Sequence, residues 1–304
     1  MSPTTAARRY DHVSFLSDLG TVDETVGVVH AVLAELAPHV RVVDLTHQVP
    51  VHDVRAGALS LVRAIGYVPS GVVIAAVDSG GRRAVAIEVA GGEGVLVGPD
   101  NGLLAPAVAM TGGAGRAVVL DRSDLHLASP GALLPVRDVF AAVAAHLCNG
   151  IDLTELGTEV DADELLPGVV PLPKPLPEGG IQADVLWVDR AGACQLNVGP
   201  DDLAPWGDAI DARLRLSCGD PSDPVVRAVD RVPDLSRLGA GSIGLVLDHT
   251  GLLALALDRR SAAEELRLVV GDQVTLSPLS EPVAGRAVPV TLRPGSDDVP
   301  PRHR

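Results

Sequence analysis

The chain has 304 residues, 47% of them hydrophobic, and a formal net charge of −15. This length is enough for one large or two ordinary domains with real cores. A strong negative charge repels phosphate backbones and anionic lipid, which argues against nucleic acid and membranes as partners.

The termini and the cysteines give little sign of export or of a metal site. No apolar run approaches the ~20 residues of a membrane span, and the first residues, MSPTTAARRY, lack the apolar segment of a signal peptide. Cys148, Cys194 and Cys218 are widely spaced, without a CxxC or a nearby pair of histidines. We therefore expect a cytoplasmic protein with no metal and with buried, unpaired cysteines.

The first half of the chain alternates short strand and helix patterns. Strands are predicted over 12–16, 40–45, 72–77, 84–88, 94–97 and 117–120, and helices after Asp23, after Asp53 and over 138–147. This alternation predicts an α/β N-terminal domain with a largely parallel sheet, covering residues 10–166. Ligands of such sheets bind beyond the carboxyl ends of the strands.

The stretch 72–88, VVIAAVDSGGRRAVAIE, is the centre of this domain. An apolar run that fits a strand buried on both faces ends at Asp78, and two glycines and two arginines precede the next strand. Asp78, Arg82 and Arg83 therefore sit where the sheet ends. The alternative is that the acid and the glycines are turn chemistry only.

The second half of the chain has a different residue pattern. Residues 167–180, PGVVPLPKPLPEGG, contain five prolines and three glycines and predict a stiff interdomain linker. Beyond it, alternating runs predict strands over 181–188, 194–198, 212–216, 225–229, 243–248, 252–257 and 273–276. We expect an all-β, small-barrel C-terminal domain over 181–280 and a flexible tail over 281–304.

Several short motifs, in this order along the chain, resemble one family. They are FLSDLG (15–20), VDLTH (43–47), AVD (76–78), GPDNGLL (98–104), RDVF with AAHL (137–140 and 144–147), VDRAG with LN (188–192 and 196–197), and GLL leading to SAA (251–253 and 261–263). The ordered set resembles the S-adenosyl-L-methionine hydroxide adenosyltransferases, relatives of fluorinase and chlorinase, over roughly residues 12–277.

This resemblance implies an architecture and a reaction. The architecture is an α/β domain and a β-barrel assembled as a homotrimer, with the small-molecule substrate bound between subunits. The reaction is attack of water or hydroxide on ribose C5′ of S-adenosyl-L-methionine, which gives adenosine and L-methionine with no additional cofactor. Since the sulfonium leaves as a neutral thioether, the protein must mainly supply an oriented, partly desolvated nucleophile.

The resemblance also assigns roles to the acids. Asp18 matches the carboxylate that accepts both ribose hydroxyls, and Asp189, with His249 nearby, faces the methionine ammonium. Asp78 matches the acid that holds and deprotonates the attacking water, with charge from Arg82 or Arg83.

Four further residues are substrate-binding candidates. His52 stands where the halogenating relatives have a ring against the nucleoside, and Asn101 lies in the 98–104 turn. Asp258 is suited to accept a hydrogen bond from the adenine amine. The aliphatic stem of Arg259 is suited to restore some of the apolar contact that the family's aromatic rings provide. The alternative is that residues 258–260 form only an exposed turn.

The sequence departs from the family around these residues. The turn after Asp78 is about three residues shorter, a span of roughly 10 Å, so neither arginine is certain to reach the substrate. Pro135 stands where the hydrolases have their catalytic histidine, and Leu134, Ala191 and Leu235 replace aromatic rings.

These departures leave two hypotheses open. One is a divergent S-adenosyl-L-methionine hydrolase, which we favour because the three acids assigned above are kept. The other is an inactive homologue that binds S-adenosyl-L-methionine or adenosine, or serves as a scaffold. A halogenating enzyme is disfavoured, because Leu134 and Val136 occupy the segment where a hydroxyl-bearing turn is expected.

Overall fold

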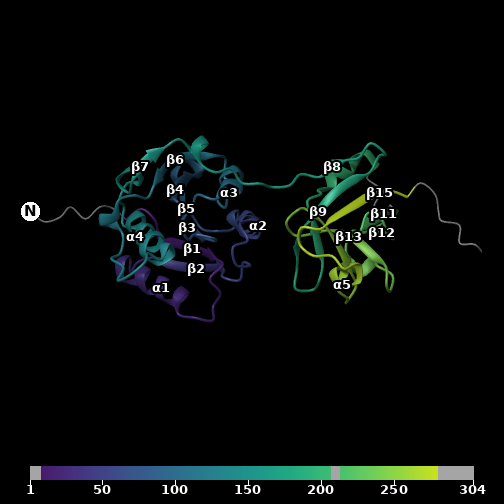
Figure 1. Cartoon of the computed structure of the whole chain (residues 1–304), viewed down its shortest axis with the longest axis horizontal. Helices are drawn as coiled ribbons and strands as arrows, with labels where there is room; N and C mark the ends of the chain where they lie inside the picture. The colour runs from purple at the N-terminus through teal and green to yellow at the C-terminus, as the bar shows by residue number, and fades with distance from the viewer. Residues whose placement is uncertain (1–7, 207–212, 280–304) are drawn as a thin grey trace, which may run out of the picture.

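The computed structural model describes residues 8–206 and 213–279. In Figure 1 these residues form an α/β unit and a β-barrel, joined by an extended segment that leaves near α3 and enters the barrel at β8. The expected sheet domain and small barrel are therefore both present. The predicted tail over 281–304 lies outside the described residues.

The first unit is built on a seven-stranded sheet with the order β2-β1-β3-β5-β4-β6-β7. The pairs β1–β2, β1–β3 and β3–β5 are parallel, whereas β4–β5, β4–β6 and β6–β7 are antiparallel. Only β4 and β7 therefore run against the other strands, which confirms the largely parallel sheet. The strands are β1 (His12–Ser17), β2 (Arg41–Thr46), β3 (Gly71–Ala76), β4 (Ala84–Val89), β5 (Gly94–Pro99), β6 (Ala114–Val119) and β7 (Thr158–Val160).

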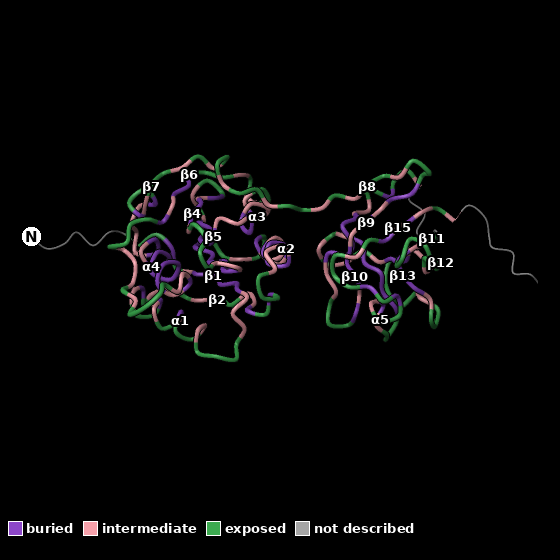
Figure 2. Tube along the Cα trace, in the orientation of Figure 1, coloured by how far each residue is buried: buried purple, intermediate pink, exposed green. Residues whose placement is uncertain are grey.

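Helices cover both faces of this sheet. On one face α1 (Thr25–Leu36) and α4 (Ala142–Cys148) pack on a core that includes Phe15 and Ile74, and on the other α2 (Val54–Ile65) packs beside α3 (Ala105–Met110). A π-helix, η3 (Val136–Ala141), leads directly into α4. Because both faces are covered, all six residues of β3 are buried, as its apolar run predicted. The buried tube in Figure 2 follows these strands.

Short helices occupy several of the connections. They are η1 (Ala90–Gly92), η2 (Ser123–Leu125), η4 (Leu153–Glu155), η5 (Ala162–Glu164), η6 (Pro200–Trp206) and η7 (Leu235–Arg237). At the start of α2, the Asp53 carboxylate accepts the backbone N–H of Ala56 at 2.9 Å, so the expected helix cap is present.

The second unit is a closed barrel. Its strands follow the order β10-β14-β13-β12-β11-β15-β9, and pairing of β10 with β9 closes the ring, while β8 adds to β9 from outside. Closure removes the exposed edges of the sheet and encloses one apolar core. The elements are β8 (Lys174–Pro175), β9 (Ile181–Val188), β10 (Cys194–Leu196), β11 (Arg213–Cys218), β12 (Val225–Arg231), β13 (Ile243–Leu247), β14 (Leu253–Leu257), α5 (Ala262–Leu266) and β15 (Gln273–Pro278).

One arginine of α2 contacts the barrel. The Arg63 guanidinium lies 5.0 Å from the ring centroid of Trp187 in β9, and its Nη1 donates to Oε1 of Gln195 in β10 at 3.4 Å. Burial lowers the pKa of Arg63 below its ordinary value, and the charge of Asp248 partly offsets that effect. The contact joins α2, which Figure 1 shows on the side of the sheet nearest the barrel, to β9 and β10.

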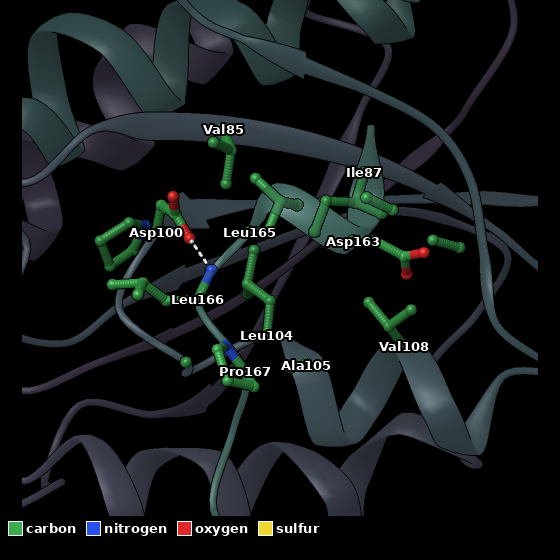
Figure 3. Close-up of a pocket in the computed structure, with 14 residues that line it drawn as sticks. Val85, Ile87, Asp100, Leu104, Ala105, Val108, Asp163, Leu165, Leu166 and Pro167 are labelled. Atoms are coloured by element: carbon green, nitrogen blue, oxygen red, sulfur yellow. Dashed lines mark hydrogen bonds between the residues drawn. The ribbon is translucent and has the colours of Figure 1, made fainter. Parts of the chain in front are cut away.

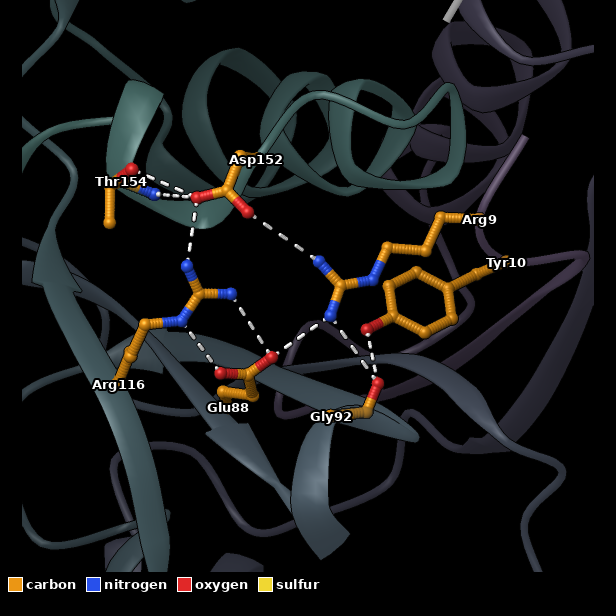
Figure 4. Close-up of polar contacts among 7 residues, drawn as sticks. All are labelled: Arg9, Tyr10, Glu88, Gly92, Arg116, Asp152 and Thr154. Carbon is orange, nitrogen blue, oxygen red and sulfur yellow. Dashed lines mark hydrogen bonds and ion pairs between the residues drawn. The ribbon is translucent and has the colours of Figure 1, made fainter. Parts of the chain in front are cut away.

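An ion-pair network ties Arg9, just before β1, to the sheet (Figure 4). Glu88 of β4 accepts hydrogen bonds from Arg9 at 2.9 Å and from Arg116 of β6 at 2.9 Å, and Arg116 also donates to Asp152 at 2.9 Å. The Tyr10 hydroxyl donates to the carbonyl of Gly92 at 2.9 Å. These bonds connect the entry to β1 with β4, β6 and the start of η4.

The three cysteines are buried and free, as predicted. None of the helices in the described part of the chain has the length and apolar character that crossing a bilayer requires.

Candidate active site

The site begins where two neighbouring parallel strands end. Ser17, the last residue of β1, lies in register with Ala76, the last residue of β3, so Asp18 and Asp78 emerge at the same edge of the sheet. Oδ2 of Asp18 accepts the backbone N–H of Asp78 at 3.2 Å. The carboxyl-end site that the α/β pattern predicts therefore brings these two acids together.

The loop before α2 adds His52 to this pair of acids. Its backbone N–H donates to the same Oδ2 of Asp18 at 3.0 Å, and its ring Nδ1 lies 3.1 Å from Oδ1 of Asp78. One carboxylate oxygen thus fixes the backbones of both His52 and Asp78. The His52 ring keeps 75% of its surface exposed, so solvent and small molecules have access to it.

Two of these residues have left-handed backbones. The φ angle is 64° at His52 and 48° at Asp78. Non-glycine residues adopt this region at a cost that the surrounding structure must offset, and such residues cluster at functional sites. Here the two hydrogen bonds to Asp18 hold both residues in place.

The two consecutive arginines point to different acids. Nη2 of Arg82 lies 2.9 Å from Oδ2 of Asp78, so the shortened turn still brings one guanidinium to this acid. Nε of Arg83 donates instead to Oδ2 of Asp100 at 3.0 Å. Arg82 therefore joins the cluster of Asp18, His52 and Asp78, and Arg83 pairs with the turn after β5.

Asn101 is hydrogen-bonded to the backbone at Asp78. Its Nδ2 donates to the carbonyl of Val77 at 3.0 Å, and its Oδ1 accepts the N–H of Leu103 at 3.1 Å. Gly102, with a φ of 88°, passes so close to the linker that a Cβ there would lie 2.8 Å from the carbonyl oxygen of Pro167. In this single chain, Asn101 fixes the end of β3 from the 98–104 turn.

A polar chain that the sequence did not predict runs from buried Ser17 and His47, next to Asp18, out to the solvent-exposed Asp44 and the partly exposed His30. Oγ of Ser17 is 2.7 Å from Nδ1 of His47, Nε2 of His47 is 3.0 Å from Oδ1 of Asp44, and Nε2 of His30 is 2.9 Å from the same oxygen. Burial raises the pKa of Asp44, but the hydrogen bonds from His30 and His47 outweigh it and lower that pKa below its ordinary value. Ser17 lies in the FLSDLG motif and His47 in the VDLTH motif, so their place in these motifs was the sequence feature that could have pointed to this chain.

Two cavities flank the 98–104 turn. One of about 260 Å³ is lined by Val54 and Arg55 of α2, by Asn101 and by the linker residues up to Pro171. The other, of about 220 Å³, lies between β4, α3 and η5 and is largely apolar; at its wall Oδ1 of Asp100 accepts the N–H of Leu166 at 2.8 Å (Figure 3). Asp18, His52 and Asp78 line neither cavity and stand at the open edge of the sheet.

The four candidates on the barrel lie in exposed turns. Oδ1 of Asp189 accepts the N–H groups of Ala191 and Ala193 at 2.9 and 2.8 Å, and His249 lies between β13 and β14. Asp258 and Arg259 lie in the turn before α5, and Arg259 has a φ of 56°. No hydrogen bond or ion pair among the described residues joins these four to the cluster around Asp78.

The described residues do not form a metal site. Within residues 8–206 and 213–279, no cluster of three or more His, Cys, Asp or Glu is arranged to hold an ion. The cluster consists instead of two carboxylates, an imidazole and a guanidinium. Such a set can bind hydroxyl groups, hold a water molecule and move a proton.

Comparisons with known proteins agree with the motif order. Residues 13–157 match the family model described as the SAM hydroxide adenosyltransferase N-terminal domain. A protein of Salinispora tropica and one of Thermus thermophilus, both named (R)-S-adenosyl-L-methionine hydrolase, are each 39% identical to this chain; both matches cover 87% of it, and 97% and 98% of the respective relative. A solved structure of an uncharacterised conserved protein from Thermotoga maritima superposes with a TM-score of 0.76 at 26% identity, covering 87% of this chain and 99% of that one. The chain thus belongs to the S-adenosyl-L-methionine hydroxide adenosyltransferase family.

Proposed function

We propose that this protein hydrolyses S-adenosyl-L-methionine to adenosine and L-methionine by attack of water on ribose C5′. The observation that carries the proposal is the meeting of Asp18, His52, Asp78 and Arg82 at the end of β1 and β3. Relatives that are matched over 97% and 98% of their own length and are named (R)-S-adenosyl-L-methionine hydrolase support the same reaction.

The reaction depends more on the position of the attacking water molecule than on acid catalysis. A sulfonium leaves C5′ as a neutral thioether, so the main requirement is a water molecule held on the opposite side of that carbon. Asp18 presents a carboxylate that uses one oxygen for backbone N–H groups, and the other is suited to the ribose hydroxyls. Asp78, with Arg82 beside it, is suited to orient the water.

The candidate residues on the barrel can take part in this reaction if subunits assemble. Four exposed turn residues of the barrel make no hydrogen bond or ion pair to the cluster within the described part of one chain: Asp189, His249, Asp258 and Arg259. We propose that they meet the cluster of a neighbouring subunit in a homotrimer and bind the methionine and adenine parts, with no metal or other cofactor. Sedimentation that gives a monomer in the presence of substrate would contradict this arrangement.

The experiment is to incubate the purified protein with each sulfonium epimer of S-adenosyl-L-methionine separately. The relatives' name specifies the (R) form, so chromatography is expected to detect adenosine and methionine in equal amounts with at least that epimer. The heat-treated protein is the control. Binding by calorimetry without any turnover would favour the inactive ligand-binding homologue, and absence of both binding and turnover would leave a scaffold.

A further inference from the structure

We propose that His52, rather than Asp78, accepts the proton of the attacking water, and that Asp78 orients the His52 ring. This role rests on the proposed hydrolysis and specifies its chemistry. The carrying observation is that Nδ1 of His52 lies 3.1 Å from Oδ1 of Asp78, at the edge of the sheet where Asp18 holds both backbones.

Both oxygens of Asp78 are already engaged. Oδ1 faces Nδ1 of His52 and Oδ2 faces Nη2 of Arg82 at 2.9 Å. An ionised carboxylate is only an acceptor, so the His52 nitrogen that faces it carries the hydrogen. Nε2, the other ring nitrogen, then bears the free lone pair that a general base needs.

The surroundings leave that nitrogen accessible. The His52 side chain is 75% exposed, whereas that of Asp78 is 23% exposed and that of Arg82 48%. Among the described residues, the charged groups bonded to His52 or to its partner Asp78 are Arg82 and Asp18 at the end of β1; Asp53, the next residue in the chain, has its carboxylate bound to the start of α2. Most of the His52 side chain is therefore open to solvent.

One carboxylate oxygen holds the backbones of both His52 and Asp78. Oδ2 of Asp18 binds the N–H of His52 at 3.0 Å and that of Asp78 at 3.2 Å. If the other oxygen of Asp18 holds the ribose, C5′ and the imidazole are positioned by one carboxylate. The left-handed φ of 64° at His52 is part of this geometry, because it turns the chain so that N–H and ring point to the same pair of acids.

The proposed step balances without another reactant. The water oxygen forms a bond to C5′ while the C5′–S bond breaks and leaves its electron pair on sulfur as the thioether of methionine. The water proton moves to Nε2 of His52, which then releases it to solvent. Adenosine, methionine and one proton are the products.

The test uses His52→Asn in the full-length protein. Asparagine tolerates a positive φ, and its amide can still donate to Asp78, but it has no proton acceptor in place of Nε2. We expect kcat to fall about 10²–10⁴-fold, which is the usual contribution of a general base, while the Kd for S-adenosyl-L-methionine by calorimetry stays unchanged. The acidic limb of the pH–kcat profile should disappear with the base.

A second variant distinguishes loss of the proton acceptor from damage to the structure. His52→Gly suits the positive φ and opens space for free imidazole, which should restore turnover in a concentration-dependent way. His39→Asn, at the opposite edge of the sheet before β2, is the matched control and should behave as wild type. Wild-type kcat in His52→Asn, or no rescue by imidazole in His52→Gly, overturns the role of His52 alone. If the wild-type protein forms no adenosine, the proposed hydrolysis itself is wrong.

Discussion

Arg82 contacts Asp78, with Nη2 and Oδ2 at 2.9 Å, although the turn between them is short. Its neighbour Arg83 is bound to Asp100. We expect Arg82→Met to lower kcat by roughly 2–5-fold, because it removes an ion pair whose arginine is about half exposed and which is therefore worth up to about 1 kcal/mol. Arg83→Met should mainly lower the melting temperature. Steady-state kinetics with calorimetry on both variants checks this, and a larger loss of kcat in the Arg83 variant contradicts it.

Asp18 is expected to act on binding. In Asp18→Asn the carboxamide keeps one acceptor oxygen for the N–H groups of His52 and Asp78, but the second atom becomes a donor. Hydrogen bonds to a charged group are worth about 1.5–3 kcal/mol, so the Kd for adenosine should rise roughly 10–100-fold. Titration calorimetry measures it, and an unchanged Kd would show that ribose is bound elsewhere.

Ser17, His47 and Asp44 lie next to one another in the order of a catalytic triad, yet Ser17 is fully buried. We expect no labelling by a fluorophosphonate reagent. Ser17→Ala should leave Nδ1 of buried His47 unpaired, at a cost of about 1–3 kcal/mol. A melting temperature several degrees lower with kcat per folded molecule unchanged is the expected result. Labelling of Ser17 would instead make this serine a nucleophile.

The network around Glu88 predicts a pH dependence of stability. Hydrogen bonds from Arg116, and also from Arg9, hold the pKa of Glu88 below its ordinary 4.5. Hydrogen bonds from Thr154, and also from Arg116, lower the pKa of Asp152 from 3.8 to about 2. Both pKa values are lower in the folded protein than in the unfolded chain. The contribution of this network to the free energy of unfolding is therefore complete above about pH 4.5 and is lost as the pH falls toward 2.

Arg116→Met tests this network. At pH 7 it should unfold about 1 kcal/mol more easily, a small value because Arg116 and Asp152 are more than one third exposed. Between pH 4.5 and 2 it should lose less stability than the wild type does. Urea titrations along this pH range measure the difference, with Arg41→Met on the exposed side of β2 as the control. Parallel pH curves for wild type and Arg116→Met would contradict the assignment.

Much of the fold could be predicted because local patterns agreed with burial. The apolar run before Asp78 is a strand buried on both faces, Asp53 caps its helix, and the alternating runs after residue 181 close into a barrel. The ordered motifs predicted the family, which the matches over 87% of the chain confirm. These features depend on residue pattern, which a single sequence contains.

The contacts inside the site depended on loop geometry. The sequence predicted one arginine near Asp78 without deciding between Arg82 and Arg83, because the direction of each side chain depends on left-handed residues at Asp78 and Gly81. It placed His52 against the nucleoside, since nothing in the sequence shows that its ring faces Asp78. The polar chain through His47 went unnoticed for the same reason, as its members are separated by up to 30 positions.

The left-handed residues at the site have a consequence for directed evolution. At His52 and Asp78 a side chain costs about 1–2 kcal/mol of backbone strain that glycine avoids. Selection for heat resistance alone should therefore recover glycine at these two positions, and the survivors should turn over slowly. Thermal stability and turnover are therefore expected to be opposed at the two residues to which we assign the chemistry.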